Sequence, residues 1–280
     1  MIARKHMAMR LIAYSPAIIL LLTSCGERAG APVPAPTVPA TEPPTAAAAA
    51  PAAPAAPASQ PGPAVPIDEH FAATRDGWRA DFTLRLPALP QAASKGMRRA
   101  CTAWLFQGLA APRGTMAETG EAALTALVAD GARPTTSTEP WYCERSVVAT
   151  HFGRGWLALR RSDVSFAGGA HTNSRVESMI VELDGVRALD LDEVVPPERQ
   201  GELRQLLARE LRRIRGLSAD GPLTSEVATD ADLPIPLPLL TDEGARFVWN
   251  PYEIGPYSDG ALEIALPAVQ MRPFLANDPW

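Results

Sequence analysis

The sequence has 280 residues and a formal net charge of −5 at pH 7. Its basic residues are almost all arginine, with lysine only at Lys5 and Lys95, and the mildly acidic total argues against nucleic acid as a partner. After the N-terminal segments described next, enough chain remains for one larger domain or two small ones.

The first residues have the pattern of a bacterial lipoprotein export signal. Basic residues precede an apolar stretch from Leu11 to Leu22, and small residues precede Cys25. The stretch is short for the ~20 apolar residues of a membrane-spanning helix, so cleavage is favoured over a permanent anchor. We expect a signal peptide over residues 1–24 and a lipid on Cys25. Because Gly26 rather than aspartate follows the cysteine, we expect the outer membrane, facing the periplasm.

An alanine- and proline-rich segment follows the expected lipid site. From Ala29 to Pro66 it contains almost no large apolar side chain. Such a segment cannot bury enough surface to offset its conformational entropy. We therefore expect residues 25–66 to be a lipidated, disordered tether and the folded part to begin near Ile67.

The rest of the chain alternates between strand-like and helix-like segments. We expect strands at 78–86, 141–151, 156–166, 174–183, 245–249 and 261–266. We expect helices at 91–109, 115–130 and 267–275, and a long helix that begins at Pro196. The segment 217–238 is expected to be a loop. Gly153-Arg154-Gly155 and Asp184-Gly185 predict hairpins. This pattern predicts an α+β fold with an antiparallel sheet packed with helices, in two small consecutive subdomains at 67–152 and 153–280.

Two cysteines remain after the lipid site. Cys101 shares a predicted helix face with Met97 and Trp104, and Cys143 shares a predicted strand face with Val147. Both sulfurs are expected to point into one helix–sheet interface. In an oxidising compartment this predicts a disulfide, and the alternative is a pair of buried free thiols.

One face of the long predicted helix is rich in arginine. Its members are Arg204, Arg209, Arg212, Arg213 and Arg215. Such a cluster could bind phosphate or an acidic partner. More often it is a solvated helix face, here with Glu202 and Glu210 as countercharges, and we favour this interpretation.

The sequence contains no motif with a recognised catalytic or cofactor-binding mechanism. The histidines His70, His151 and His171 lack metal-ligand spacing, and no phosphate loop, dinucleotide fingerprint or nucleophile elbow is present. We expect no enzyme activity, no metal and no cofactor. A hydrolase would need His171 in a pocket with Asp163 or Glu177.

Two local motifs are candidates for binding. The first is the glycine-rich turn from Phe166 to Asn173, and the second is the proline- and tyrosine-rich segment from Trp249 to Gly260. Paired glycines allow close approach of another chain, and tyrosine combines an apolar ring with a polar tip. The candidate partner-binding residues are Gly168, Gly169, His171, Asn173, Tyr252 and Tyr257. The alternative is that the glycines form a wide turn or bulge in which His171 caps local carbonyls, and that the tyrosine rings pack over the core. We favour this alternative for the turn and for Tyr252, and we leave Tyr257 open.

These two motifs carry a family resemblance. The Gly-Gly-Ala-His-x-Asn turn and the segment Asn250-Pro251-Tyr252-Glu253-Ile254-x-Pro256-Tyr257-x-x-Gly260 resemble the RsiV-type extracytoplasmic domain. The resemblance covers about residues 156–275, and residues 71–150 resemble more loosely the companion domain of PdaC-type peptidoglycan deacetylases. It implies a lysozyme-like enzyme or peptidoglycan as the partner. Together with the export signal and the lack of catalytic motifs, this predicts a non-catalytic envelope lipoprotein that binds such a partner. The rival functions are a cell-wall hydrolase, a lysozyme inhibitor and a structural assembly factor.

Overall fold

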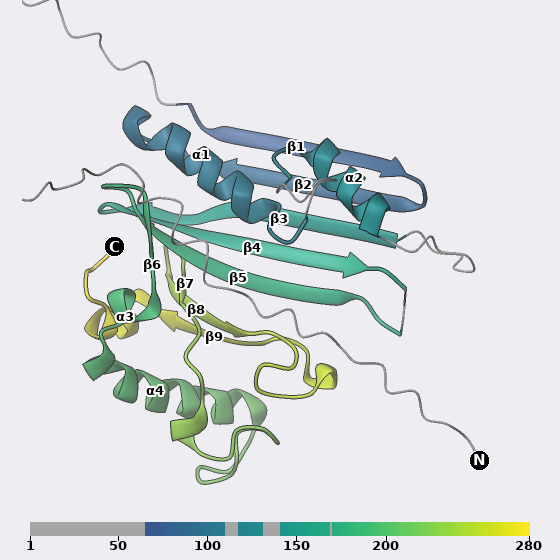
Figure 1. Cartoon of the computed structure of the whole chain (residues 1–280). Coiled ribbons are helices and arrows are strands. Elements are labelled where there is room, and N and C mark those ends of the chain that lie inside the picture. Colours follow the sequence, from purple (N-terminus) through teal and green to yellow (C-terminus); the bar gives the residue numbers. More distant parts are fainter. Residues whose placement is uncertain (1–64, 110–116, 131–140, 169) are drawn as a thin grey trace, which may run out of the picture. The chain divides into compact units, whose positions relative to one another are not determined.

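The computed structural model describes residues 65–109, 117–130, 141–168 and 170–280 (Figure 1). The expected signal peptide, Cys25 and nearly all of the expected tether lie outside these residues. The described residues belong to one compact unit. None of the helices in this part of the chain is both long and apolar enough to cross a membrane.

A six-stranded sheet in the order β1-β2-β3-β4-β5-β6 forms the centre of the fold. Its strands are β1 (Ile67–Arg75), β2 (Trp78–Leu86), β3 (Trp141–Gly153), β4 (Trp156–Phe166), β5 (Asn173–Glu182) and β6 (Arg187–Leu189). All neighbours are antiparallel except β2 and β3. These two are parallel because α1 (Gln91–Leu105) and α2 (Gly120–Asp130) intervene between them in the chain.

Strand β4 shows why the sheet is covered on both faces. Successive side chains of a strand point to opposite faces. Leu157 and Leu159 lie in a core with residues of α1 and α2, whereas Trp156 and Ala158 lie in a second core. All four are almost fully buried. The middle of the sheet is therefore an internal layer between two hydrophobic cores.

The second core contains a smaller sheet and a long helix. The sheet consists of β7 (Leu239–Leu240), β8 (Gly244–Trp249) and β9 (Leu262–Pro267), and the helices nearby are α3 (Leu191–Val194) and α4 (Pro197–Arg215). Helix α4 begins with a proline, whose fixed φ suits the first turn, and ends at Gly216 with φ 65°. Leu203, Leu207 and Leu211 form its buried stripe. Figure 1 shows this sheet on the side of the large sheet away from α1 and α2.

The predicted α+β fold is confirmed, and its main sheet, packed with helices, is antiparallel as predicted except for the parallel pair of β2 and β3. Both predicted hairpins form: Arg154 and Gly155 have φ values of 43° and 84°, as a tight two-residue turn requires, and β5 pairs with β6 across the Asp184-Gly185 turn. The expected subdomain boundary at 152/153 falls between the last two residues of β3, just before the turn to β4. Residues on either side of it therefore share one sheet.

Several elements differ from the sequence-based expectation. Strands β1, β6 and β7 were not expected, and α1 ends at Leu105 rather than near 109. The expected helix at 267–275 is a short α5 (Ala268–Met271) followed by a 3-10 turn, η4 (Arg272–Phe274). Pro267 is the last residue of β9. Pro273 interrupts the final helix, because proline lacks the N–H that a continuing helix needs.

Candidate functional site

The two candidate motifs meet at the start of β5. The rings of His171 and Tyr257 are stacked, with centroids 3.7 Å apart and planes 18° from parallel. The Tyr257 hydroxyl donates to the carbonyl oxygen of Thr172 over 2.6 Å. The sequence named His171 and Tyr257 as candidates, and the structure brings them into contact although they lie far apart in the chain.

Tyr252 extends this cluster to solvent. Its ring centroid is 5.7 Å from that of Tyr257, and 66% of the residue is exposed. We call the group of His171, Tyr252 and Tyr257 the aromatic surface. The ring of Tyr252 is one of the few large apolar groups that the described residues expose, so it is available for contact with a partner.

The backbone of Tyr252 is strained. Its φ is 72°, in the left-handed region that bulky side chains rarely adopt. Two hydrogen bonds hold the turn: the Tyr252 N–H donates to the Gly255 carbonyl, and the Glu253 N–H donates to the Asn250 carbonyl, both at 3.0 Å. Strain of this kind persists only where the surroundings impose it, and it clusters at functional sites.

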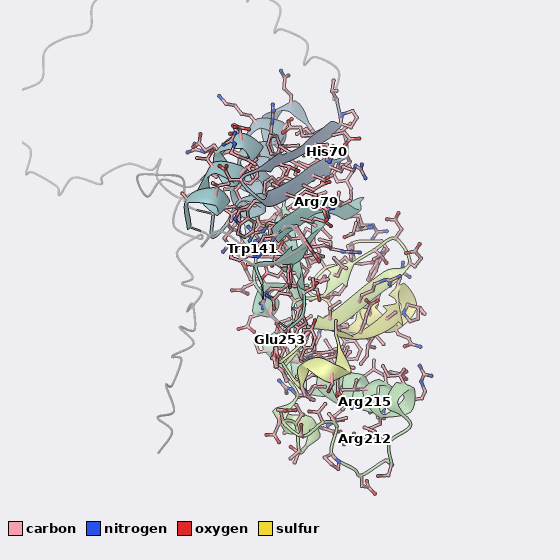
Figure 2. The ribbon with its side chains drawn as sticks, turned by 90° about the vertical axis from the view of Figure 1, so that its right-hand side faces the viewer. His70, Arg79, Trp141, Arg212, Arg215 and Glu253 are labelled. Atoms are coloured by element: carbon pink, nitrogen blue, oxygen red, sulfur yellow. The ribbon has the colours of Figure 1, made fainter. Side chains whose placement is uncertain are left out.

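Asn250 joins this turn to the edge of the large sheet. It is 6% exposed, and its side-chain oxygen accepts the N–H of Val176 at 2.7 Å while its nitrogen donates to the Val176 carbonyl at 3.0 Å. Strand β6 pairs with β5 only from Ile180 onward, so no described strand pairs with Val176 on that side. The amide of Asn250 therefore takes the place of a neighbouring strand. The Glu253 carboxylate, labelled in Figure 2, accepts both the backbone and the side-chain N–H of Asn250.

The glycine-rich turn is held by aromatic neighbours. Gly168 has φ 79°, and a Cβ there would lie 3.4 Å from the ring of Trp141. The Tyr142 hydroxyl lies 2.9 Å from the Thr172 hydroxyl. Asn173 begins β5 and is exposed, and Gly169 lies outside the described residues. These contacts lie on either side of His171, which stacks on Tyr257.

A charge network centred on buried Arg161 lies on the face of the large sheet that α1 covers. Arg161, with 2% of its side chain exposed, contacts Asp163 at 3.2 Å and Glu177 at 2.8 Å. It also donates to the Trp104 carbonyl at 2.9 Å, near the end of α1. Desolvation by burial raises the pKa of Asp163 above its ordinary value and outweighs the nearby Arg145 and Arg161, which lower it.

Next to this network is a cavity of about 240 Å³ whose lining includes Glu177, Asn250 and Glu253. The pairing that a hydrolase would need is not formed among the described residues: Asp163 and Glu177 both pair with Arg161, whereas His171 contacts Thr172 and Tyr257. No group of three or more metal-ligating side chains comes together in the part of the chain that is described.

The two cysteines do not form the predicted disulfide. Both are buried free thiols in the core under α1, so the shared interface was predicted correctly but the covalent bond was not. Desolvation by burial raises the pKa of Cys101 to about 12. Oxidation proceeds through the thiolate, and an apolar interior disfavours that form.

Asn250, Thr172 and Tyr142 contribute to the site but were not predicted as site residues. Asn250 had a local signal, because a polar residue between a strand and Pro251 is a frequent turn former. Nothing local distinguishes Tyr142 or Thr172, since their roles arise from contacts between distant segments. His70 and His151, the other histidines considered, lie elsewhere: His70 pairs with Asp81, and His151 lies between Asp242 and the Pro279 carbonyl.

The fold and surface define a class of protein: an α+β domain with helices on one face of its main sheet, a second sheet on the other, and an aromatic cluster on its loops. Residues 195–268 match the family described as "Protein of unknown function (DUF3298)". This segment contains α4, the second sheet, Asn250, Tyr252 and Tyr257, but not His171.

Two solved structures of DUF3298 proteins are similar to this chain. The protein from Bacteroides fragilis is 18% identical with a TM-score of 0.54, and the match covers 77% of this chain and 94% of that one. The protein from Pseudomonas aeruginosa PAO1 is 15% identical with a TM-score of 0.52, covering 77% and 95%. At these identities the similarity shows a shared fold. No curated protein matches the sequence.

Proposed function

We propose that this protein is a non-catalytic binding module of the cell envelope that recognises a lysozyme-like enzyme through its aromatic surface. The observation that carries the proposal is Tyr252, an aromatic residue that is both strongly exposed and held at a positive φ. Folding alone gives no reason to hold the backbone of Tyr252 at a strained angle, because its side chain is largely exposed and makes few packing contacts.

The composition of the surface suits a protein partner. Tyrosine and tryptophan are enriched among the residues that dominate binding energy, because a rigid ring buries much area at a small entropic cost. A stable complex requires about 800 Å² on each partner, so neighbouring groups such as Asn173 and Glu253 also belong to the contact area. The resemblance of the two motifs to the RsiV-type domain supplies the partner class.

The expected export signal supports an envelope location. A lipid on Cys25 and a long tether give the domain access to enzymes that act on the cell wall, and the outer membrane facing the periplasm remains the proposed site of attachment. The acyl chains would make the attachment stable, since each buried methylene contributes about 0.8 kcal/mol.

Direct binding of peptidoglycan is the second candidate. It is favoured by the exposure of the Tyr252 ring, because an aromatic face can pack against the apolar face of a sugar. Inhibition of a lysozyme-like enzyme, or hydrolysis of the cell wall, are the remaining alternatives. They differ in outcome, because an inhibitor blocks muramidase activity and a hydrolase releases soluble fragments without any added enzyme.

A binding experiment separates these functions. Residues 62–280, the unit that contains both hydrophobic cores, are immobilised and presented with lysozyme-type muramidases and, separately, with purified peptidoglycan. We expect Tyr252→Ala and Tyr257→Ala to weaken binding of the muramidase at least tenfold, the loss typical of a dominant interface residue. Phe152→Ala, which removes an exposed aromatic ring at the β3–β4 hairpin, is the matched control and should bind normally. Equal binding by all variants would refute the proposed surface.

A further inference from the structure

A second concave region lies along α4, separate from the aromatic surface. A cavity of about 820 Å³ is bounded by α4 and by residues of the segment from Leu217 to Ala231. The helix contributes Gly201, Gln205, Arg209 and Arg213, which recur at every fourth position and therefore form one ridge. Arg204 and Arg212 line it as well. Figure 2 labels Arg212 on this helix.

Two of the arginines are fixed in the walls of the groove. Arg212 is 8% exposed, and it donates through Nε to the Gly221 carbonyl at 3.0 Å and pairs with Asp230 at 2.6 Å. Arg204 donates through Nε to the Leu233 carbonyl at 2.9 Å. These contacts hold the following segment against the helix. They use only part of each guanidinium, which has five N–H donors.

Arg209 differs from its neighbours. It is exposed in the groove, and no hydrogen bond or ion pair to it occurs among the described residues. Arg213 pairs with Glu210 on its own helix. The groove therefore holds four arginines, and Asp230 is the single acidic residue of its lining. This local excess of positive charge occurs in a chain whose net charge is −5.

We propose that this groove binds a ligand that carries phosphate groups. Guanidinium groups bind phosphate through paired, charge-assisted hydrogen bonds, and prepositioned ones lose little entropy in doing so. Leu217, Ala219 and Ala231 line the groove as well and provide apolar surface for the body of the ligand. Arg209 supplies the cation that has no other partner in the described part of the protein. The sequence alone favoured a solvated helix face here. The groove along this face favours a binding site instead.

The experiment uses residues 62–280 and inorganic pyrophosphate, measured by titration calorimetry at low ionic strength. We expect Arg209→Gln to weaken binding about tenfold, the loss of roughly one charge-assisted hydrogen bond. Arg99→Gln is the matched control, because Arg99 is also exposed on a helix without a hydrogen bond or ion pair among the described residues, and the change in net charge is identical. Its affinity should stay within twofold of the unmodified protein.

A second measurement identifies the source of the phosphate. Cosedimentation with phosphatidylglycerol vesicles, lost in Arg209→Gln and absent with phosphatidylcholine, would assign the groove to a lipid headgroup. Pyrophosphate binding without vesicle binding would assign it to a soluble phosphate ester. Absence of both, or an equal loss in Arg209→Gln and Arg99→Gln, would overturn the proposal. Binding of a muramidase by Arg209→Gln should be unchanged, so the two proposals fail independently.

Discussion

The side chain of Asn250 pairs with both backbone groups of Val176, as a strand would. Its oxygen accepts the Val176 N–H and its nitrogen donates to the Val176 carbonyl. The same residue begins the turn that holds Tyr252 at a positive φ. One amide therefore connects the edge of the large sheet to the most exposed part of the aromatic surface.

Asn250→Ala should destabilise the protein by about 1–3 kcal/mol, because the N–H and carbonyl of half-buried Val176 lose their partners. Urea unfolding followed by circular dichroism measures the change. Asn173→Ala, at an exposed position of β5, the strand that contains Val176, is the control and should remain within about 0.5 kcal/mol of the unmodified protein. If the two variants were equally stable, Asn250 would have no bridging role.

Arg161→Met should destabilise the protein by about 3–5 kcal/mol, because it leaves the partly buried carboxylates of Asp163 and Glu177 with fewer cations. It also removes the donor to the Trp104 carbonyl near the end of α1, a helix with no basic residue in its last turn. Arg160→Met, on the adjacent exposed position of β4, is the matched control. Thermal unfolding of both variants tests the difference, and similar melting temperatures would contradict the structural role of Arg161.

Asp163 should make stability depend on pH in the acidic range. Its pKa is raised in the folded state, so between the ordinary value of 3.8 and the raised value the folded chain binds more protons than the unfolded chain. The contribution of Asp163 to stability therefore falls as pH rises through this window and is restored as pH is lowered. Denaturant unfolding at a series of pH values should show that the free energy of unfolding of the unmodified protein minus that of Asp163→Asn falls as pH rises through this window. A difference that grows with pH would mean that the pKa of Asp163 is lowered instead.

The two thiols should be unreactive in the folded protein. Because burial raises the pKa of Cys101 to about 12 and also raises that of Cys143, almost no thiolate forms at pH 8. Residues 62–280 should react with Ellman's reagent slowly when native and release two equivalents in urea, one for each cysteine of that segment. Absence of reaction in urea would reveal the disulfide that the sequence suggested.

Tyr252→Gly should stabilise the domain while removing partner binding. Glycine adopts a positive φ freely, whereas the left-handed conformation costs other residues about 1–2 kcal/mol. Part of that gain is offset by the greater freedom of glycine in the unfolded chain, so we expect a net gain of about 0.5–1 kcal/mol. Tyr252→Ala removes the ring without relieving the backbone and should show no such gain. A destabilised Tyr252→Gly would indicate that the ring supports the fold.

The sequence was sufficient for elements whose signals are local. Alternating side chains predicted β2, the start at Pro196 and the apolar stripe predicted α4, and glycine-containing turns predicted two hairpins. The strand β1 had such a signal too, because Asp76 and Gly77 form its turn with β2 at φ 48° and 84°. Its alternation is weak, since β1 is an edge strand with few buried side chains.

The short strands had no local signal of comparable strength. Strands β6 and β7 contain three and two residues, and they are ordered by the neighbours with which they pair. The disulfide prediction depended on a shared interface, which is correct, and on a redox environment, which geometry does not fix. Shared burial places two thiols in one core without bonding them.

The sequence by itself determined most of the longer helices and strands, and it identified the two motifs whose polar and aromatic groups meet in the fold. Only the tertiary structure decided that His171 stacks on Tyr257, that Asn250 completes the edge of β5, and that the arginines of α4 line a groove. The physical reason is the range of the interactions: periodicity, caps and turn preferences act within a few residues, whereas these contacts join segments brought together by burial of two cores.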